Sequence, residues 1–168
     1  MSGKEGSLRR EIRQSKPFRS RQQEAVLGLA RTAALLKRQG ARVVESYGVS
    51  PEQYNVLRIL RGANPERLPT LDIVERMIEP SPAITRLLDK LESKKLVHRV
   101  RCPKDRRQVL CSITADGLDL LGKLDEPMHR VAKESMKLGR EDLDTLVRLL
   151  DQVRAAFEKP SRKEKIEK

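Results

Sequence analysis

The spacing of hydrophobic residues predicts a chain that is mainly α-helical. In residues 21–48, apolar side chains recur every three or four residues, as they do along one face of a helix. The same spacing returns in residues 115–157, where Pro127 should kink or loosen one long helix and Gly139 should end it before a last helix begins. The stripes include Val26, Leu29 and Leu36 in the first region and Leu143, Leu146, Leu150 and Val153 in the last helix.

Three shorter helices are predicted between these stripes. Ser50 and Pro51 are a typical cap and first residue of a helix that should end near residues 61–62. A second helix should span residues 70–78, and its buried side chains are expected to be Leu71, Val74 and Ile78, with Ile73 and Met77 beside them. A third should begin at Ser81 and Pro82 and bury the stripe Ile84, Leu87, Leu88 and Leu91.

Two runs that follow, residues 96–101 and 109–113, have the alternation of strands and are joined by a short charged loop. Two short helices followed by a β-hairpin give the order of a winged helix-turn-helix. We therefore expect such a DNA-binding domain over residues 49–114, mainly α with a small hairpin wing, and a helix capped by Thr114 after it.

The flanking regions, residues 21–48 and 115–157, carry more apolar surface than one winged helix needs for its own core. A helical dimerisation region is the use that we favour, and an intramolecular bundle is the alternative. Residues 1–20 are polar and basic and should form a disordered arm. Residues 158–168 form a charged tail.

Positive charge is concentrated in one segment. The chain has 36 Lys and Arg against 24 Asp and Glu, a formal net charge of +12. Residues 81–107 alone hold nine basic and three acidic side chains, a net charge of +6. Such a patch indicates an anionic partner, with double-stranded DNA first and a membrane surface second. For the basic termini, a solvated surface is an equal alternative.

Other classes of protein have little support in the sequence. No apolar run approaches the roughly 20 residues of a membrane helix, and no hydrophobic stretch follows the basic N-terminus as in a secretory signal. Two cysteines make no disulfide framework, so we expect a cytoplasmic protein. The two histidines do not form a metal-ligand cluster, and no phosphate-binding loop, metalloprotease motif or nucleophile elbow indicates an enzyme. We expect no metal or cofactor.

The outer face of the third short helix has the residues that a recognition helix needs. Short side chains near its start allow a close approach to base edges, and an arginine can reach guanine O6 and N7. Further along, a lysine is suited to backbone phosphates, as is the start of the helix itself. The candidate DNA contacts here are Ser81, Pro82, Ala83, Thr85, Arg86 and Lys90, with Thr70 at the start of the preceding helix.

The wing supplies a second group of candidates. Its tip carries Lys104, Arg106 and Arg107 and is narrow enough for an arginine to enter the minor groove. Asp105 is unsuited to phosphate contact, but it can orient an arginine through charge-assisted hydrogen bonds. The alternative is that Asp105 only favours the turn and pairs on the surface.

Two cysteines lie on the predicted hairpin. If Cys102 pairs opposite Val109, then Cys111 faces Val100, and the two sulfurs are diagonal and too far apart for a disulfide. We favour two small buried hydrophobic residues over a redox sensor.

Residues 50–124 resemble the MarR family (multiple antibiotic resistance regulators) of winged-helix transcription factors. The resemblance is carried by "SPEQYNVLRIL", "ITRLLDKLESKKLV" and above all "DRRQVLCSITADGLDLL", and with the flanking helices it covers most of residues 22–157. The segment Glu79-Pro-Ser-Pro82 departs from the family, in which a glycine-containing turn is commoner at this place.

The resemblance implies a homodimer whose recognition helices read adjacent major grooves of a pseudo-palindrome. It also implies that Arg107 is the minor-groove arginine, that Asp105 orients it, and that Arg106 contacts the backbone. We therefore expect a transcriptional regulator, a repressor above all, and a sequence-neutral architectural DNA binder is the alternative. Many relatives are released by small aromatic acids, metals or cysteine oxidation, so a small-molecule effector is expected, near Tyr47, Tyr54 and His129.

Overall fold

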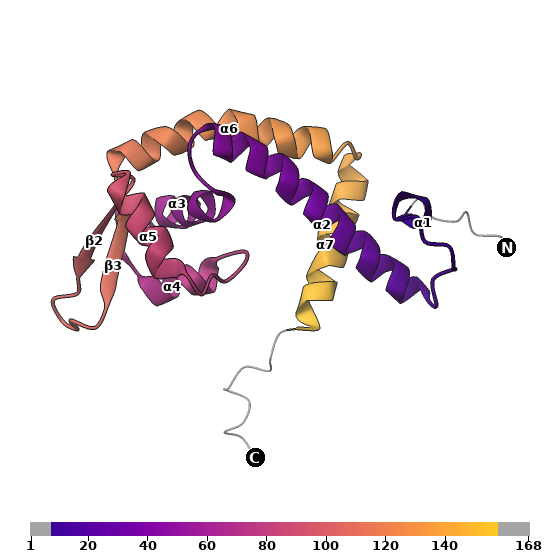
Figure 1. The fold of residues 1–168 in the computed structure, drawn as a ribbon, viewed down its shortest axis with the longest axis horizontal. Helices are drawn as coiled ribbons and strands as arrows, with labels where there is room; N and C mark the ends of the chain where they lie inside the picture. The colour runs from indigo at the N-terminus through magenta and orange to yellow at the C-terminus, as the bar shows by residue number, and fades with distance from the viewer. Residues whose placement is uncertain (1–7, 158–168) are drawn as a thin grey trace, which may run out of the picture. The chain divides into compact units, whose positions relative to one another are not determined.

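The structure is a computed structural model that describes residues 8–157. Its elements, in chain order, are α1 (Leu8–Glu11), α2 (Arg21–Ser46), α3 (Pro51–Ala63), β1 (Leu68–Pro69), α4 (Thr70–Arg76), α5 (Ile84–Ser93), β2 (Val97–Arg101), β3 (Val109–Ile113), α6 (Ala115–Ser135) and α7 (Arg140–Ala155) (Figure 1). A mainly helical chain with a small antiparallel sheet is thus confirmed. Residues 1–7 of the predicted arm and the predicted tail, 158–168, lie outside the described residues.

The chain divides into two compact units, residues 1–131 and 132–168. The first holds the predicted winged helix, together with α1, α2 and most of α6. The second holds α7, in which no side chain is buried.

Local signals in the sequence set the ends of several helices. The Ser50 hydroxyl accepts a hydrogen bond from the Gln53 amide, and the Gln53 side chain accepts one from the Ser50 amide, so α3 begins with the predicted cap in its complete, reciprocal form. Likewise, the Thr114 hydroxyl accepts from the Gly117 amide and caps α6. The same hydroxyl donates to the Lys95 carbonyl, which ties the start of α6 to the turn before β2.

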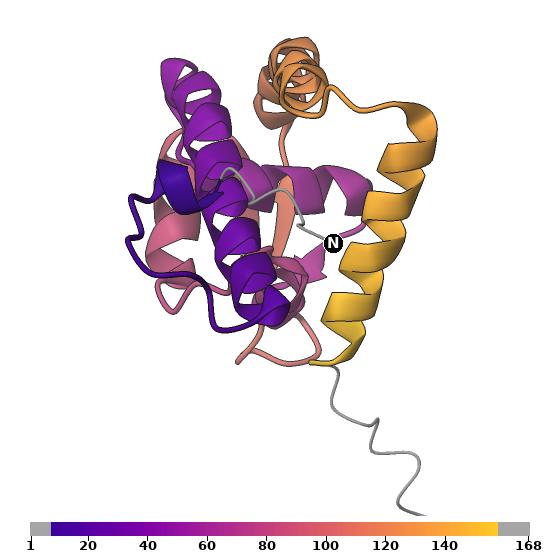
Figure 2. The same cartoon turned by 90° about the vertical axis from the view of Figure 1, so that its right-hand side faces the viewer.

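The expected disorder of residues 1–20 does not hold for Leu8–Glu11, which form α1 beside α2 (Figure 2). The Leu8 side chain lies close to Gly28 of α2, where a Cβ atom would come within 3.7 Å of its terminal methyl group. This distance is an ordinary van der Waals contact, and it places the Leu8 side chain against α2.

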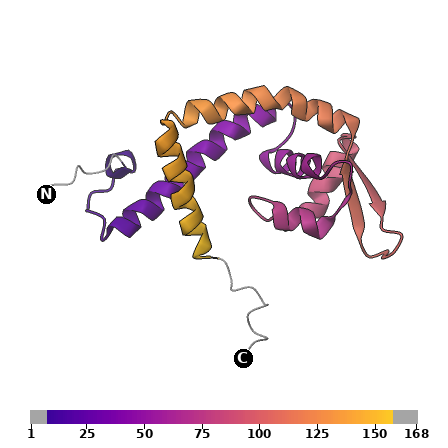
Figure 3. The ribbon, with the colours of Figure 1, turned by 180° about the vertical axis from the view of Figure 1, so that it is seen from behind.

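The sheet has three strands in the order β1-β3-β2, all antiparallel. The hairpin β2–β3 matches the prediction to within one residue, and its loop forms one extremity of the first unit in both Figure 1 and Figure 3. The sequence analysis did not predict β1. Its two residues, Leu68 and Pro69, pair with Cys111 and Leu110 of β3, a contact that no local pattern encodes.

One core joins all the elements of the winged helix. Its fully buried side chains come from α2, α3, α4, α5, β3 and α6, and they are Val44, Val56, Leu57, Leu60, Ile73, Leu88, Leu91, Cys111, Leu121 and Leu124. The predicted stripe of α5 is confirmed, since Leu88 and Leu91 are buried and Ile84 and Leu87 pack against the core.

The prediction for α4 was wrong about its buried face. Ile73 and Met77 are the buried residues, whereas Leu71 and Ile78 are 73% and 78% exposed. The helix also ends at Arg76, two residues early, because the backbone of Met77 is already extended. A short helix with apolar residues on more than one side does not determine its own orientation, and contact with α3 and the sheet selects Ile73.

The start of α5 also differs from the prediction. The helix begins at Ile84 with Ala83 as its cap residue, and no side chain caps it. Ser81 precedes Pro82, and a residue before proline is steered away from helical geometry. The Ser81 hydroxyl instead accepts a hydrogen bond from the Ala83 amide within the turn that leads into the helix.

Gly139 does not end α6, as the sequence suggested. Helix α6 runs without interruption through Pro127 and stops at Ser135, and Gly139 is the N-cap residue of α7. The missing Pro127 amide removes one hydrogen bond, but packing of Leu121 and Leu124 in the core holds the preceding turns.

The hairpin register differs by one residue from the one assumed for the cysteines. Arg99, and not Val100, lies opposite Cys111, because a tight turn at Asp105 brings Gln108 opposite Cys102. Cys102 therefore lies on the other face of the hairpin from Cys111. Both thiols are free; Cys111 is fully buried, whereas Cys102 is partly exposed.

Gly117, in the first turn of α6, should be the glycine most sensitive to substitution. A Cβ atom there would lie 2.5 Å from the Leu96 carbonyl oxygen and 2.7 Å from Ile113. We expect Gly117→Ala to lower the free energy of unfolding by about 1–3 kcal/mol or more, the range for overpacking. Denaturant titration followed by circular dichroism measures this change.

Gly122 in the same helix is the matched control, since a Cβ atom there would meet nothing within 4 Å. Gly122→Ala should raise the stability by roughly 0.5–1 kcal/mol, because alanine favours the helix. Equal effects of the two substitutions would contradict the packing of Gly117.

Candidate nucleic-acid interface

The exposed side of α5 is positively charged because its two carboxylates are already paired. Arg86 and Lys90 are exposed and have no ion-pair partner among the residues that the structure describes. Asp89 and Glu92, the acidic residues of the helix, both accept hydrogen bonds from Arg99 of β2. Residues four apart lie on one side of a helix, so Arg86 and Lys90 form a cationic edge.

The turn before α5 presents the predicted small residues. Pro82, Ala83 and Thr85 are exposed, and Ser81 is half-buried with its hydroxyl occupied by the Ala83 amide. Because no side chain of the described residues caps α5, the amides of its first turn are available to a ligand. This is the arrangement in which a helix start accepts a phosphate oxygen.

The wing exposes all three of its predicted cations, Lys104, Arg106 and Arg107. Asp105 shapes this loop through its backbone contacts. Its carboxylate accepts a hydrogen bond of 3.0 Å from the Arg107 amide, and its carbonyl accepts one of 2.9 Å from the Gln108 amide. These contacts are those of a residue that favours the turn, the alternative role considered for Asp105. Within the described residues no guanidinium contacts this carboxylate.

Thr70 lies apart from these exposed residues. Its hydroxyl donates to the Val109 carbonyl at 3.2 Å and lies 4.0 Å from the Cys111 sulfur. The contact fastens the start of α4 to β3. Burial raises the pKa of the Cys111 thiol, so the sulfur is a neutral packing group and not a thiolate at neutral pH.

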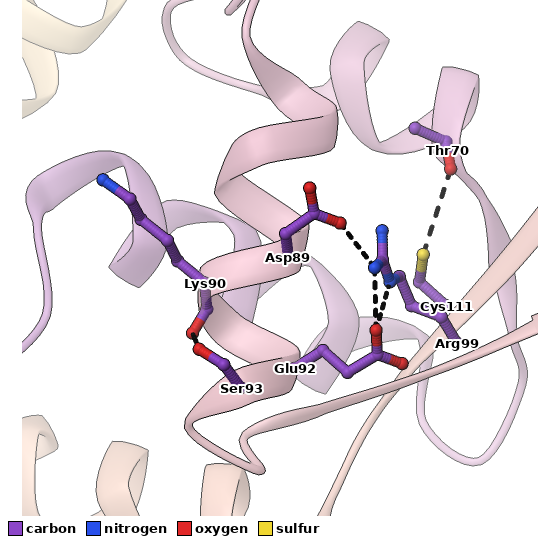
Figure 4. A network of polar contacts seen from close by, with 7 residues as sticks. All are labelled: Thr70, Asp89, Lys90, Glu92, Ser93, Arg99 and Cys111. Atoms are coloured by element: carbon purple, nitrogen blue, oxygen red, sulfur yellow. Dashed lines mark hydrogen bonds and ion pairs between the residues drawn. The ribbon is translucent and has the colours of Figure 1, made fainter.

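Sequence reasoning missed Arg99, which is the centre of the polar network in Figure 4. Its Nε donates to Glu92 at 2.9 Å, and its Nη2 donates to Glu92 at 2.7 Å and to Asp89 at 2.5 Å. The hydrogen bonds to Glu92 are the main reason that the pKa of Arg99 is raised further. The signal in the sequence was present: two acids three apart on a helix, and an arginine on the inner face of the next strand.

A second polar link holds the end of α5. The Lys94 ammonium donates to the Gly48 carbonyl at 2.5 Å, in the turn between α2 and α3, and lies 3.4 Å from the Gln53 side chain. Gly48 has a positive φ of 78°, which favours glycine at this turn. The C-terminal end of α5 is thereby joined to two other helices.

Comparisons with known proteins agree with this geometry. The sequence model of the MarR family matches residues 49–109. A crystal structure of a MarR transcription factor from Planctomyces limnophilus is 38% identical, with a TM-score of 0.64, over 81% of this chain and 99% of that one. The chain belongs to the MarR family.

Other relatives support the assignment. The HTH-type transcriptional regulator YkoM of Bacillus subtilis, itself uncharacterised, is 30% identical over 72% of this chain and 78% of its own length. Sco3205 of Streptomyces coelicolor, a MarR-family regulator solved in complex with DNA, has the same fold at 20% identity, with a TM-score of 0.74 over 86% of this chain and 96% of that one. This MarR-family protein is therefore a DNA-binding transcriptional regulator and not an enzyme.

The MarR-family chain also contains a groove, which lies between α2, the start of α3 and the segment after α4. Its volume is about 690 Å³, and most of its wall is apolar. Lys37 of α2 and Glu79, which follows α4, both line the groove. They form an ion pair in which the Lys37 Nζ lies 2.6 and 2.8 Å from the two carboxylate oxygens of Glu79. The other lining residues are Ala33, Ala34, Leu36, Pro51, Glu52, Asn55, Met77 and Ile78.

The residues predicted for an effector are not among those that line this groove. Tyr54 is half-buried in α3, with the Arg58 guanidinium 5.8 Å from its ring centre, and burial raises the pKa of its phenol. Tyr47 is exposed at the end of α2, and His129 is exposed on α6. In residues 8–157, no three His, Cys, Asp or Glu side chains come together as a metal site requires. Over the same range, no helix has the length and hydrophobicity needed to span a membrane.

The role of Asp105 can be tested with two substitutions. Asp105→Asn keeps the side-chain oxygen that accepts from the Arg107 amide, whereas Asp105→Ala removes it. We expect Asp105→Asn to bind a given DNA duplex at least as tightly as the wild type, because a negative charge near phosphate is lost. Asp105→Ala loses the same charge and should bind about fivefold more weakly than Asp105→Asn, the effect of one lost hydrogen bond of about 1 kcal/mol.

Fluorescence anisotropy with one labelled duplex measures both affinities, and thermal unfolding serves as the control for folding. If the carboxylate acted by holding a guanidinium, Asp105→Asn would weaken binding as much as Asp105→Ala does.

Proposed function

We propose that this protein is a repressor that binds a pseudo-palindromic operator in double-stranded DNA as a homodimer. The observation that carries the proposal is a set of seven exposed cations on α5, β2 and the turns at their ends. Within the described residues none of them has an ion-pair partner, although Arg99 between them is fully engaged. They are Arg86, Lys90, Lys95, Arg101, Lys104, Arg106 and Arg107.

These cations are suited to two different grooves of the duplex. Arg86, in the first turn of α5 and close to the small side chains of Ala83 and Thr85, has the reach for guanine edges in the major groove. Arg107, at the tip of the hairpin loop, can enter the minor groove. Lys90 and Arg106 then contact phosphates, which set the register but carry no sequence information. The DNA complex of the Streptomyces relative supports this use of the shared fold.

The exposed apolar side chains support a homodimer. Leu143, Leu146 and Leu150 recur along α7 and are only partly buried, and Val153 on the same stripe is 47% exposed. In the first unit, the N-terminal half of α2 exposes Val26 and Leu29, while Leu36 lies in the groove. A striped helix gains most of its stability by burying its apolar face, and a second copy of the chain provides a surface for that.

The preference for one DNA sequence distinguishes a regulator from an architectural DNA binder. The wild type should bind an inverted repeat, selected by the protein from a random pool, about 10³-fold or more tightly than random duplex at physiological salt. Leu146→Asp should yield a monomer and lose most of this preference, because the two half-sites are then bound separately. Light scattering and anisotropy titrations measure the two quantities, with Thr145→Asp on the neighbouring, exposed position as the control.

Equal affinity of the wild type for all duplexes would contradict the proposal and favour the architectural reading. A Leu146→Asp variant that remains dimeric would contradict the role of α7.

We further propose that the groove binds a small aromatic carboxylic acid that releases the protein from DNA. The apolar wall accommodates a ring, and the Lys37 ammonium at its rim accommodates the carboxylate. The hydrogen bond from Lys37 to Glu79 raises the pKa of Lys37, so this residue is a cation at neutral pH. A bound carboxylate would compete with Glu79 for Lys37 and thereby release the segment that leads into α5.

Filling the groove should remove the response to such an acid. We expect millimolar benzoate to weaken operator binding by the wild type but not by Ala34→Leu, whose larger side chain occupies the groove. Ala30→Leu, one helical turn away on an exposed position of α2 that does not line the groove, is the matched control and should respond as the wild type does. Anisotropy with labelled operator measures the response, and an unchanged response in Ala34→Leu would contradict the site.

A further inference from the structure

Arg99 joins the two elements of the winged helix that expose the candidate DNA contacts. It lies on β2, two residues into the strand, and its guanidinium reaches Asp89 and Glu92 on α5. The Arg99 side chain is only 20% exposed, less than either of its partners, so the guanidinium lies in the angle between helix and strand. Nε and Nη2 of Arg99 both donate to Glu92, and Nη2 also donates to Asp89. These contacts fix the orientation of the guanidinium as well as its position.

The geometry divides the polar surface of α5 into two edges. Thr85, Asp89 and Glu92 follow the spacing of one helix face, and the two acids on this face meet Arg99. In Figure 4, the Lys90 side chain points away from Arg99, and Arg86 is one turn before Lys90 on the same edge. One edge of the helix is thus fastened to the wing, and the other is available for DNA.

Arg99 contacts the middle of α5 at Asp89 as well as its last turn at Glu92. Two other contacts lie at the C-terminal end of the helix. The turn after the helix is closed by a backbone hydrogen bond from the Leu96 amide to the Leu91 carbonyl, and Lys94 reaches the Gly48 carbonyl. Both contacts are near the C-terminal end of α5. Asp89 lies five residues before Lys94, in the middle of α5, so its contact with Arg99 resists rotation of α5 relative to the hairpin.

We propose that Arg99 is a positioning residue that sets the angle between the recognition helix and the wing, so that Arg86 and Arg107 reach their grooves at the same time. The inference rests on the proposed function, because it concerns two simultaneous contacts with one operator. Arg99 itself does not contact DNA in this proposal. Its second effect is electrostatic, since its single positive charge offsets part of the negative charge of two carboxylates that would otherwise repel phosphates.

A double-mutant cycle on the full-length protein separates positioning from a general effect. The operator is an inverted repeat selected by the wild type from a random pool. We expect Arg99→Gln to weaken its binding about 30-fold or more and Arg107→Ala to weaken it strongly. In the double variant, Arg107→Ala should cost at least fivefold less than it does alone, because the wing no longer meets its groove. Arg86→Ala should show the same coupling, whereas Lys133→Ala, an exposed lysine near the end of α6, should show none.

The electrostatic effect is removed with a triple variant, Asp89→Asn, Glu92→Gln and Arg99→Gln, which has no unpaired carboxylate. The three substitutions together raise the net charge by one. If positioning matters, this variant therefore binds random DNA at least as tightly as the wild type but binds the operator more weakly. Arg99→Lys keeps the positive charge but cannot form the two-pronged contact. We expect it to bind random DNA like the wild type, whereas Arg107→Ala in this background should still weaken operator binding less than it does alone. Thermal unfolding verifies that every variant is folded. If Arg99→Gln is not folded, the double-mutant cycle is measured with Arg99→Lys in its place.

The outcomes are distinct. A wild type that prefers no operator overturns the proposed function and this inference with it. A wild type with a clear preference, combined with additive effects of Arg99 and Arg107 or a triple variant that binds like the wild type, overturns this inference alone.

Discussion

The burial of Leu88 and Leu91 holds α5 in place, and the rest of the winged helix depends on that packing. Both side chains are almost fully buried in a core that Cys111 of the wing hairpin and Leu121 of α6 also enter. Burial of one leucine is worth roughly 1.5–3 kcal/mol, more than an exposed ion pair contributes. The apolar contacts therefore hold α5 on the core, and the polar contacts around it act on orientation.

The distribution of charge follows from this arrangement. A helix that packs through one face has the remaining residues for two tasks, attachment to its neighbours and contact with a ligand. In α5 the acids serve attachment, since Asp89 and Glu92 pair with Arg99, while Arg86 and Lys90 are exposed and available for a ligand. The two carboxylates of α5 share the one charge of Arg99, so the cations that remain exposed on the segment are those without an acidic partner among the described residues. Asp105 follows the same rule, as it serves the turn that presents Arg107.

Features encoded by neighbouring residues could be predicted from the sequence. The caps at Ser50 and Thr114, the buried stripe of α5 and the limits of β3 depend on short-range patterns and were found. The exposed cations of α5 and the wing tip could also be predicted, because unpaired charged side chains on the polar face of a helix or at the tip of a loop stay in contact with solvent. Features decided by contacts between distant segments were missed or wrong: the face that α4 buries, the pairing of β1, and the register that places Arg99 opposite Cys111. Arg99 was overlooked for the same reason, because in the sequence it is one of nine basic residues in its segment, and only the register and the packing of α5 single it out.

The two ends of α5 are fastened very differently, and this asymmetry bears on regulation. Its C-terminal half is held by Lys94, by Arg99 and by the turn into β2, whereas its first residue has no side-chain cap. The segment before it contains Pro80 and Pro82, whose fixed φ angles stiffen it, so that a displacement at Glu79 is passed on to the start of the helix. Glu79 is also the residue that Lys37 binds at the rim of the groove. On the proposed function, an effector in the groove therefore acts on the end of the recognition helix that has the fewest attachments within the described chain. That is also the end that exposes Ala83 and Thr85, so a small rotation there is enough to separate their side chains from base edges while the core and the wing stay in place.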